Sequence, residues 1–123
     1  MDKWQAQNSF WNSFGIPAWE EHSVPDNQKN VYPRITYEAA TATFETLVPI
    51  TASIWDKSTS WATADTLANT IESYIKSMGC PEVEGGRYRV FIGDTTFAQK
   101  MDDPADDQIK RILLNVTFEF MTN

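Results

Sequence analysis

Apolar residues recur at every second position in the stretch KRILLNVTFEFM (110–121). Successive side chains of an extended backbone point to opposite faces, so this alternation predicts a half-buried β-strand. We expect a central or near-central strand on which the other elements pack. Its inward face would carry five apolar side chains, each worth about 1.5–3 kcal/mol when fully buried: Ile112, Leu114, Val116, Phe118 and Phe120.

The pattern changes to a helical period between Trp61 and Met78. Apolar residues recur there at intervals of three and four, which is typical of a helix with one buried face. Asp65 in the first turn and Lys76 in the last complement the helix dipole, and Gly79 follows as a helix terminator. The sequence therefore predicts a helix over 61–78.

Three shorter segments also predict strands: residues 34–43, 47–55 and 87–93. The first two are separated by only a few residues, so we expect an antiparallel hairpin with its turn near 43–46. Pro49 lacks a backbone N–H, which favours an edge strand or a bulge at that point.

Aromatic residues dominate the N-terminal part. Residues 2–14 predict an amphipathic helix that ends at Gly15. Either this helix covers one face of the sheet, or part of it packs on a neighbouring subunit. Residues 16–33 and 94–108 show no period and are predicted to be irregular. The helix would present one stripe of side chains: Trp4, Gln7, Trp11 and Phe14.

The order helix, strand, strand, helix, strand, strand predicts a single α+β domain over residues 1–123. Residues 1–33 would form the N-terminal helix and an irregular connection, and residues 34–123 the β-β-α-β-β core. We expect a mostly antiparallel four-stranded sheet with the central helix on one face, together with the N-terminal aromatic helix.

Composition narrows the class of function. Aromatic residues make up 13% of the chain, a surplus that suits a protein with more than one surface to bury. The net charge of −7 disfavours a domain that binds nucleic acid through its phosphates. It does not prevent DNA from passing nearby without binding.

The cysteine count and the N-terminus indicate where the protein would function. Cys80 is the single cysteine, so we expect no internal disulfide, no cysteine metal cluster and a reducing compartment. The sequence MDKWQAQNSF lacks the layout of a signal peptide, and no apolar run approaches about 18 residues. We expect a soluble protein that does not enter a membrane.

Few residues suggest catalysis. His22 is the only histidine, so a serine or cysteine nucleophile would lack its usual base. Gly85 and Gly86 precede a predicted strand rather than a helix, unlike a phosphate-binding loop. Glu82 and Glu84 would act as a catalytic carboxylate pair only in a concave pocket with a raised pKa. We expect no enzyme and no cofactor.

Four aspartates form the densest charged cluster of the sequence. The cluster lacks the spacing and the tight turn of a calcium loop, so we expect no metal there. It would be either a solvated acidic loop or a surface that repels polyanions such as DNA. Its members are Asp102, Asp103, Asp106 and Asp107.

Several segments, in their order and spacing, resemble the tail-completion or tail-terminator proteins of long-tailed bacteriophages. They are YPRITYE (32–38), IWDKSTSW (54–61), GGRYRVFIGDTTFAQKM (85–101) and IKRILLNVTFEF (109–120). The resemblance implies an α+β fold and a non-enzymatic structural protein of the virion neck, made and assembled in the host cytoplasm. Such proteins form a ring, usually of six copies, that stops growth of the tail tube and joins it to the DNA-filled head.

The resemblance implies as partners further copies of the chain, the tail-tube protein and a head-completion or connector protein, with DNA passing nearby. Two alternatives remain open: another virion component, such as a stopper or minor capsid protein, and a monomeric protein-binding adaptor. Lumen candidates are the four aspartates of the acidic cluster. Interface candidates are Trp4, Trp11, Phe14, Phe97, Lys100 and Arg111.

Overall fold

Strand β7 (Ile109–Thr122) is the centre of the fold. The computed structural model describes residues 3–38, 47–83, 85–93, 96–102 and 106–122. One edge of β7 pairs antiparallel with β3 (Leu47–Lys57), along the whole of β3. The five alternating apolar side chains of β7 are all buried, so the prediction of a central, half-buried strand is confirmed.

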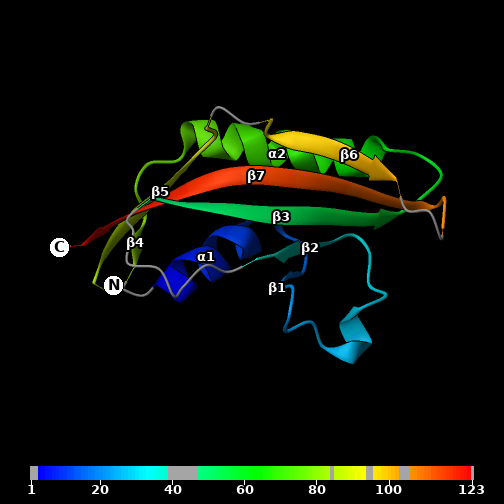
Figure 1. Cartoon of the computed structure of the whole chain (residues 1–123), viewed down its shortest axis with the longest axis horizontal. Helices are drawn as coiled ribbons and strands as arrows, with labels where there is room; N and C mark the ends of the chain where they lie inside the picture. The colour runs from blue at the N-terminus through cyan, green and yellow to red at the C-terminus, as the bar shows by residue number, and fades with distance from the viewer. Residues whose placement is uncertain (1–2, 39–46, 84, 94–95, 103–105, 123) are drawn as a thin grey trace.

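Two strands share the other edge of β7. Strand β5 (Gly86–Phe91) pairs with residues 117–122, and β6 (Ala98–Asp102) pairs with residues 110–114. Figure 1 shows β6 and β3 on opposite sides of β7. Between these two paired stretches, residues 92–97 connect β5 to β6, whereas only residues 115 and 116 separate the corresponding positions of β7. Thus β5 and β6 are two parts of one interrupted neighbour of β7.

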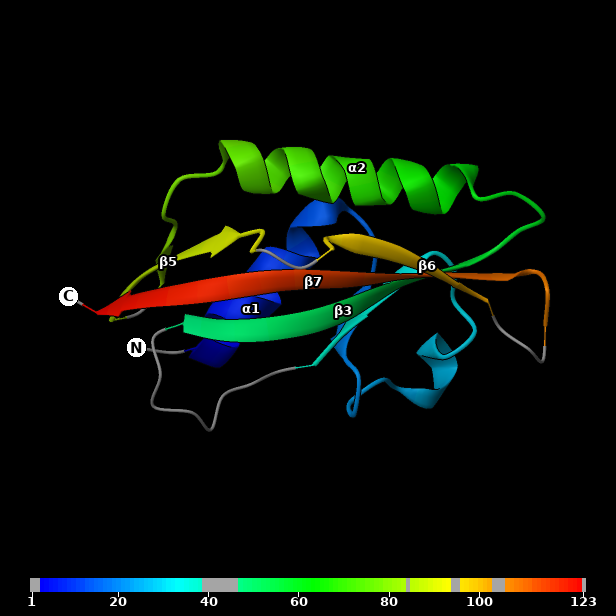
Figure 2. The same cartoon turned by 45° about the horizontal axis from the view of Figure 1, so that its top comes forward.

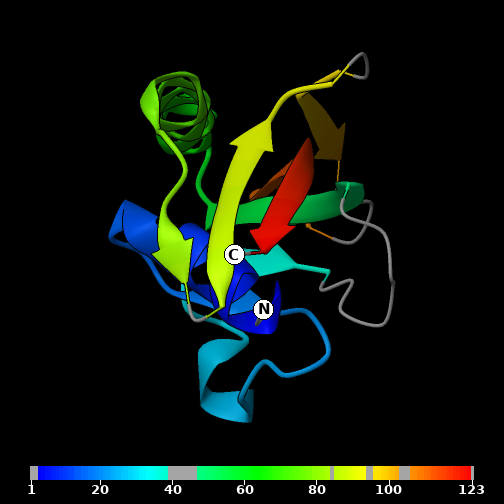
Figure 3. The same cartoon turned by 90° about the vertical axis from the view of Figure 1, so that its left-hand side faces the viewer.

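The remaining strands extend the sheet at both ends. Strand β2 (Arg34–Tyr37) pairs antiparallel with β3, and β1 (Ala18–Glu20) pairs parallel with β2. Strand β4 (Glu82–Val83) pairs antiparallel with β5, as Figure 3 shows. The strand order is β1-β2-β3-β7-β5-β4, with β6 beside β7.

The prediction of a mostly antiparallel four-stranded sheet is therefore wrong, because the described residues form a mixed sheet of seven strands. Strand β1 lies in the segment 16–33 that was predicted to be irregular, and three residues are too few to show an alternating pattern. Strand β6 lies in the predicted loop 94–108. Its positions facing the helices hold Ala98 and Lys100, so it carries no run of large apolar residues.

The predicted first hairpin is described only in part. Strand β2 ends at Tyr37 rather than 43, and the predicted turn at 43–46 lies outside the described residues. Pro49 lies in an inner strand opposite Thr117. The described part of β2 pairs only with residues 52–55 of β3. The described part of β2 therefore does not require a backbone N–H at Pro49.

Both α-helices lie on the same face of the sheet. Helix α2 (Ala62–Ser77) confirms the predicted central helix and runs along β7 (Figure 2). Helix α1 (Lys3–Trp11) continues into the 3₁₀ turn η1 (Asn12–Phe14) and ends at Gly15, whose φ of 77° favours glycine. A second 3₁₀ turn, η2 (Asp26–Gln28), lies in the connection to β2.

Aromatic contacts join the two helices to the sheet. The ring centroid of Phe10 lies 5.4 Å from that of Phe118 and 5.9 Å from that of Tyr74 on α2. Trp11 stacks on Tyr37 at 6.1 Å. The N-terminal helix thus covers one face of the sheet and contributes to a single core.

On the opposite face the described residues form no α-helix, and we call it the open face. Its side chains come from the alternate positions of β2, β3, β5, β6 and β7. Leu47 is 47% exposed there. The open face comprises Arg34, Thr36, Leu47, Pro49, Thr51, Ser53, Trp55, Arg87, Arg89, Phe91, Gln99, Met101, Arg111, Leu113, Asn115, Thr117, Glu119 and Met121.

Candidate interaction surfaces

Three neighbouring residues form a cationic and aromatic row across the open face. Arg34 lies opposite Trp55, and Trp55 lies opposite Arg111, so the row crosses β2, β3 and β7. The guanidinium carbon of Arg111 lies 4.8 Å from the Trp55 ring centroid, and that of Arg34 lies 5.6 Å away. One indole therefore attracts two guanidinium groups. We call this set the Arg–Trp–Arg row.

Hydrogen bonds fix the orientation of the Arg–Trp–Arg row. The indole N–H of Trp55 donates to Thr36 Oγ1 at 2.8 Å, and Arg111 Nε donates to Ser53 Oγ at 3.0 Å. The row borders a shallow pocket of about 250 Å³. The pocket is lined by Glu21, Val24, Lys29, Arg34, Thr36, Trp55 and Arg111.

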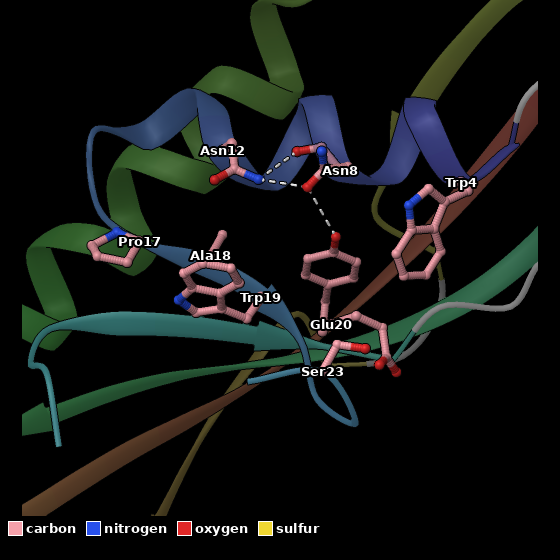
Figure 4. A pocket seen from close by; sticks show the side chains of 9 residues that line it. Trp4, Asn8, Asn12, Pro17, Ala18, Trp19, Glu20 and Ser23 are labelled. Carbon is pink, nitrogen blue, oxygen red and sulfur yellow. Dashed lines mark hydrogen bonds between the residues drawn. The ribbon is translucent and has the colours of Figure 1, made fainter. Parts of the chain in front are cut away.

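A larger groove of about 460 Å³ lies between the N-terminal helix and strand β1 (Figure 4). Trp4, Asn8 and Asn12 are spaced four residues apart, which places them on one side of the helical segment. Trp19 and Glu20 lie across the groove on β1. The groove thus has a tryptophan on each wall, and the two asparagine side chains lie on the helix side.

Tyr37 and Asn8 set the polar pattern of this groove. The Asn8 side-chain carbonyl accepts a hydrogen bond from the Tyr37 hydroxyl at 3.2 Å and another from Asn12 Nδ2 at 2.8 Å. Burial, with the nearby Glu20 charge, raises the pKa of Tyr37 to about 12. Tyr37 therefore stays protonated at neutral pH and acts as a donor.

Glu20 and His22 form a local ion pair at the end of β1. Glu20 Oε2 accepts from the backbone N–H of His22, and His22 Nδ1 lies 2.8 Å from Glu20 Oε1. Burial raises the pKa of Glu20, but the hydrogen bonds from His22 outweigh it and leave the pKa below its usual value. The Glu20 hydrogen bond raises the pKa of His22.

The aromatic interface candidates separate into buried and exposed groups. Trp11 is 0% exposed and Phe97 is buried, so both side chains contribute to the core. Phe14 is half-buried and packs on Tyr74 at 5.3 Å. Trp4, by contrast, is 43% exposed and stands at the edge of the groove. Of these four, Trp4 presents the largest free surface.

Lys100 lies on β6, and its side chain reaches the start of α2. Its Nζ is 3.2 Å from Asp65 Oδ2 and 5.0 Å from the ring centroid of Trp61. Lys110 Nζ lies 5.5 Å from the same ring. Lys100 therefore links the edge of the sheet to the helix and remains exposed.

The acidic cluster lies around the connection from β6 to β7. Asp106 Oδ1 accepts from the backbone N–H of Gln108 at 2.9 Å, and Lys57 Nζ lies 3.8 Å from Asp106 Oδ2. Asp107 is exposed. Asp102 is the last residue of β6, and Asp103 lies outside the described residues. The two described residues of the loop part of the cluster, Asp106 and Asp107, lie beside Lys57 and Lys110.

The described side chains offer little to a metal or a catalytic reaction. No group of three or more His, Cys, Asp or Glu residues among them could hold a metal ion. Glu82 pairs with Arg87 and is exposed, whereas Glu84 lies outside the described residues. Cys80 is exposed. No helix in the described ranges has the length and apolar character needed to cross a membrane.

Sequence reasoning placed Arg111 at an interface but did not predict its neighbours Trp55 and Arg34. Their proximity depends on the register of three strands, which the alternating pattern does not specify. The four-residue spacing of Trp4, Asn8 and Asn12 could have predicted the helical wall of the groove. Strand β1, which forms the opposite wall of the groove, shows no comparable spacing in the sequence.

The fold defines the class of protein as an α+β domain with a mixed sheet and two α-helices on one face. The solved structure of the gp17 protein of bacteriophage SPP1 is similar, with a TM-score of 0.56. The match covers 97% of this chain and 87% of that chain at 13% sequence identity. The chain therefore shares its fold with a bacteriophage protein. No family model and no curated protein matches the sequence.

Proposed function

We propose that this chain is a non-enzymatic structural protein of a phage virion neck. As a tail-terminator or tail-completion protein, it would cap the tail tube and provide the joint to the DNA-filled head. The observation that carries the proposal is the similarity of fold to SPP1 gp17 over 97% of the chain. The sequence resemblance over residues 31–121 supports the same assignment.

The arrangement of the sheet supports a role in assembly. Both α-helices pack on one face, so the stability of the domain does not require the open face to be covered by the chain itself. The open face displays charged, aromatic and apolar side chains together, a mixture that suits protein interfaces. A partner can therefore dock there without disturbing the core.

A ring of six copies joins one patch of each subunit to a different patch of the next. Trp4, Lys100 and Arg111 are our interface residues, because each has an exposed or half-exposed side chain in the structure. The acidic cluster from Asp102 to Asp107 is our lumen surface. Negative charge there would repel DNA phosphates and let DNA pass without sticking.

The proposal is tested by deleting the gene from the phage that carries it and imaging the tails by negative stain beside wild type. Over-long tails, or normal tails that fail to join filled heads, are expected. Adding back the gene on a plasmid must restore normal particles. Unchanged particles would overturn the neck assignment and favour the protein-binding adaptor, whose ligand would occupy the groove beside Trp4 and Trp19.

A further inference from the structure

The four arginines of the chain fall into two pairs with different surroundings. Arg87 pairs with Glu82, and Arg89 Nε pairs with Glu119 Oε1. Among the side chains that the structure describes, no carboxylate forms an ion pair with Arg34 or Arg111. This difference matters because the chain has 17 acidic residues for 10 basic ones.

Arg34 also keeps unused hydrogen-bonding capacity. Its Nη1 donates to the backbone carbonyl of Val31 at 3.3 Å, but its Nε is buried and has no partner among the described atoms. A buried N–H without an acceptor costs free energy.

Both guanidinium groups lie against the same ring, that of Trp55. Arg34 also lies 4.8 Å from the ring centroid of Tyr32. The aromatic rings orient the guanidinium planes in advance, so less side-chain entropy is lost on binding.

We propose that the Arg–Trp–Arg row is a binding site for the carboxylate groups of an acidic segment of a partner protein. A guanidinium group donates two parallel hydrogen bonds to a carboxylate, and such charge-assisted pairs are specific in geometry. The site lies on the open face, over which the part of the chain that the structure describes places no α-helix. This inference goes beyond the proposed function and is tested without a virion.

The size of the site favours a protein carboxylate over nucleic acid. Binding to DNA through phosphates requires many basic residues along the contact. Lys29 is the one further basic residue that lines the described pocket, and Glu21 borders the same pocket. Glu21 Oε1 lies 3.8 Å from His22 Nε2, its one ion pair among the described side chains. The row is therefore suited to one or two carboxylates.

The test follows the side-chain Nε–H signals of all four arginines by NMR in the ¹⁵N-labelled full chain. The probe is the blocked peptide Gly-Gly-Glu-Glu-Gly-Gly, with Gly-Gly-Gln-Gln-Gly-Gly as the uncharged comparison and a thymidine hexanucleotide as a source of phosphate. We expect the acidic peptide to shift Arg34 and Arg111 saturably, with little change at Arg87 and Arg89. The amide peptide should shift none of them.

The variants Arg111→Gln and Arg34→Gln should each weaken peptide binding at least about tenfold, as expected for loss of a charge-assisted hydrogen bond. Arg89→Gln is the matched control, because Arg89 also lies on the open face and stacks on Phe91 at 4.9 Å. It should change the affinity less than about twofold. Backbone amide spectra of each variant check that it is folded.

The proposal is overturned if the acidic peptide gives no saturable shift, or shifts Arg87 and Arg89 as strongly as the row. It is also overturned if the amide peptide binds equally well or the hexanucleotide binds more tightly. None of these results would alter the tail phenotype that tests the proposed function, so the two failures are distinguishable.

Discussion

The side-chain amide of Asn115 donates a hydrogen bond to the backbone carbonyl of Thr96 at 2.9 Å. The backbone N–H of Asn115 donates to the carbonyl of Phe97 at 2.8 Å. These bonds join β7 to the chain that connects β5 with β6. Asn115 thus holds the interrupted edge of the sheet at the point where regular pairing fails.

Asn115→Ala should lower the free energy of unfolding by about 0.5–1.5 kcal/mol, the usual contribution of one hydrogen bond. Urea denaturation monitored by circular dichroism measures the change. Thr117→Ala, on the same face of β7, is the comparison, because no described hydrogen bond of its side chain is lost. If the two variants unfold at the same urea concentration, Asn115 does not secure this edge.

Replacement by alanine should lower the stability of the domain far more at Trp11 than at Trp4. Trp11→Ala removes a fully buried side chain and should cost about 3–5 kcal/mol. This is a large part of a typical domain stability of about 5–15 kcal/mol. Trp4 is exposed, so Trp4→Ala should change stability by less than about 0.5 kcal/mol.

Thermal and urea unfolding of the two tryptophan variants provide the measurement. Trp11→Phe keeps most of the buried area and serves as a folded control. A Trp4→Ala variant as unstable as Trp11→Ala would show that Trp4 contributes to the core, which would remove it as an interface residue.

The Glu20–His22 pair should titrate as a unit with a defined pH window. The raised pKa of His22 means that its contribution to stability is fully present below its ordinary value of 6.5 and is lost as the pH rises through the folded pKa. The lowered pKa of Glu20 means that its contribution is present above 4.5 and is lost as the pH falls through the folded value. The pair therefore stabilises most between these two ordinary values.

NMR titration of the His22 ring protons should give a pKa above 6.5 in the native chain. Glu20→Gln should bring that pKa back toward its ordinary value, because the carboxylate charge is removed. The stability change should be small, since His22 is 76% exposed. An unchanged His22 pKa in Glu20→Gln would refute the pairing in solution.

Replacing Asp102, Asp103, Asp106 and Asp107 with asparagine should leave the fold intact and reduce infectious yield. Asparagine retains an acceptor oxygen for the bond that Asp106 accepts from Gln108. Loss of the negative charge would hinder DNA passage or head joining.

The control for this variant neutralises an equal number of acids elsewhere: Asp26, Glu38, Glu72 and Glu82. Plaque counts compare the two variants with wild type. Normal yield from the acidic-cluster variant, or equal loss from both, would remove the cluster from the lumen.

The strongest elements of the fold could be predicted because their patterns are long. Strand β7 was predicted over 110–121 and spans 109–122, and α2 was predicted over 61–78 and spans 62–77. In both cases repeated burial of one face fixes the period. The short strands β1 and β6 gave no such pattern. They pair because neighbouring backbone is available beside them, which depends on the whole sheet.

Prediction of the candidate sites had a similar limit. Lys100 and Arg111 could be proposed as exposed basic residues, but Trp55 was not recognised as the partner of Arg111 because they are 56 positions apart in the chain. Trp11 was one of the interface candidates on the aromatic stripe of the N-terminal helix. The structure buries it against Tyr37 and Phe118, because this side of the helix lies on the sheet.

The central position of β7 also determines when this domain can fold during synthesis. The β2–β3 pair and the β4–β5 pair can form early, but β7 joins them and is translated after both. Until it leaves the ribosome, β3 and β5 each lack their main partner and expose unpaired edges, which favour aggregation. The sheet therefore cannot be completed until β7 has been synthesised. Chaperones that bind exposed strand edges would therefore bind the nascent chain before β7 pairs with β3 and β5.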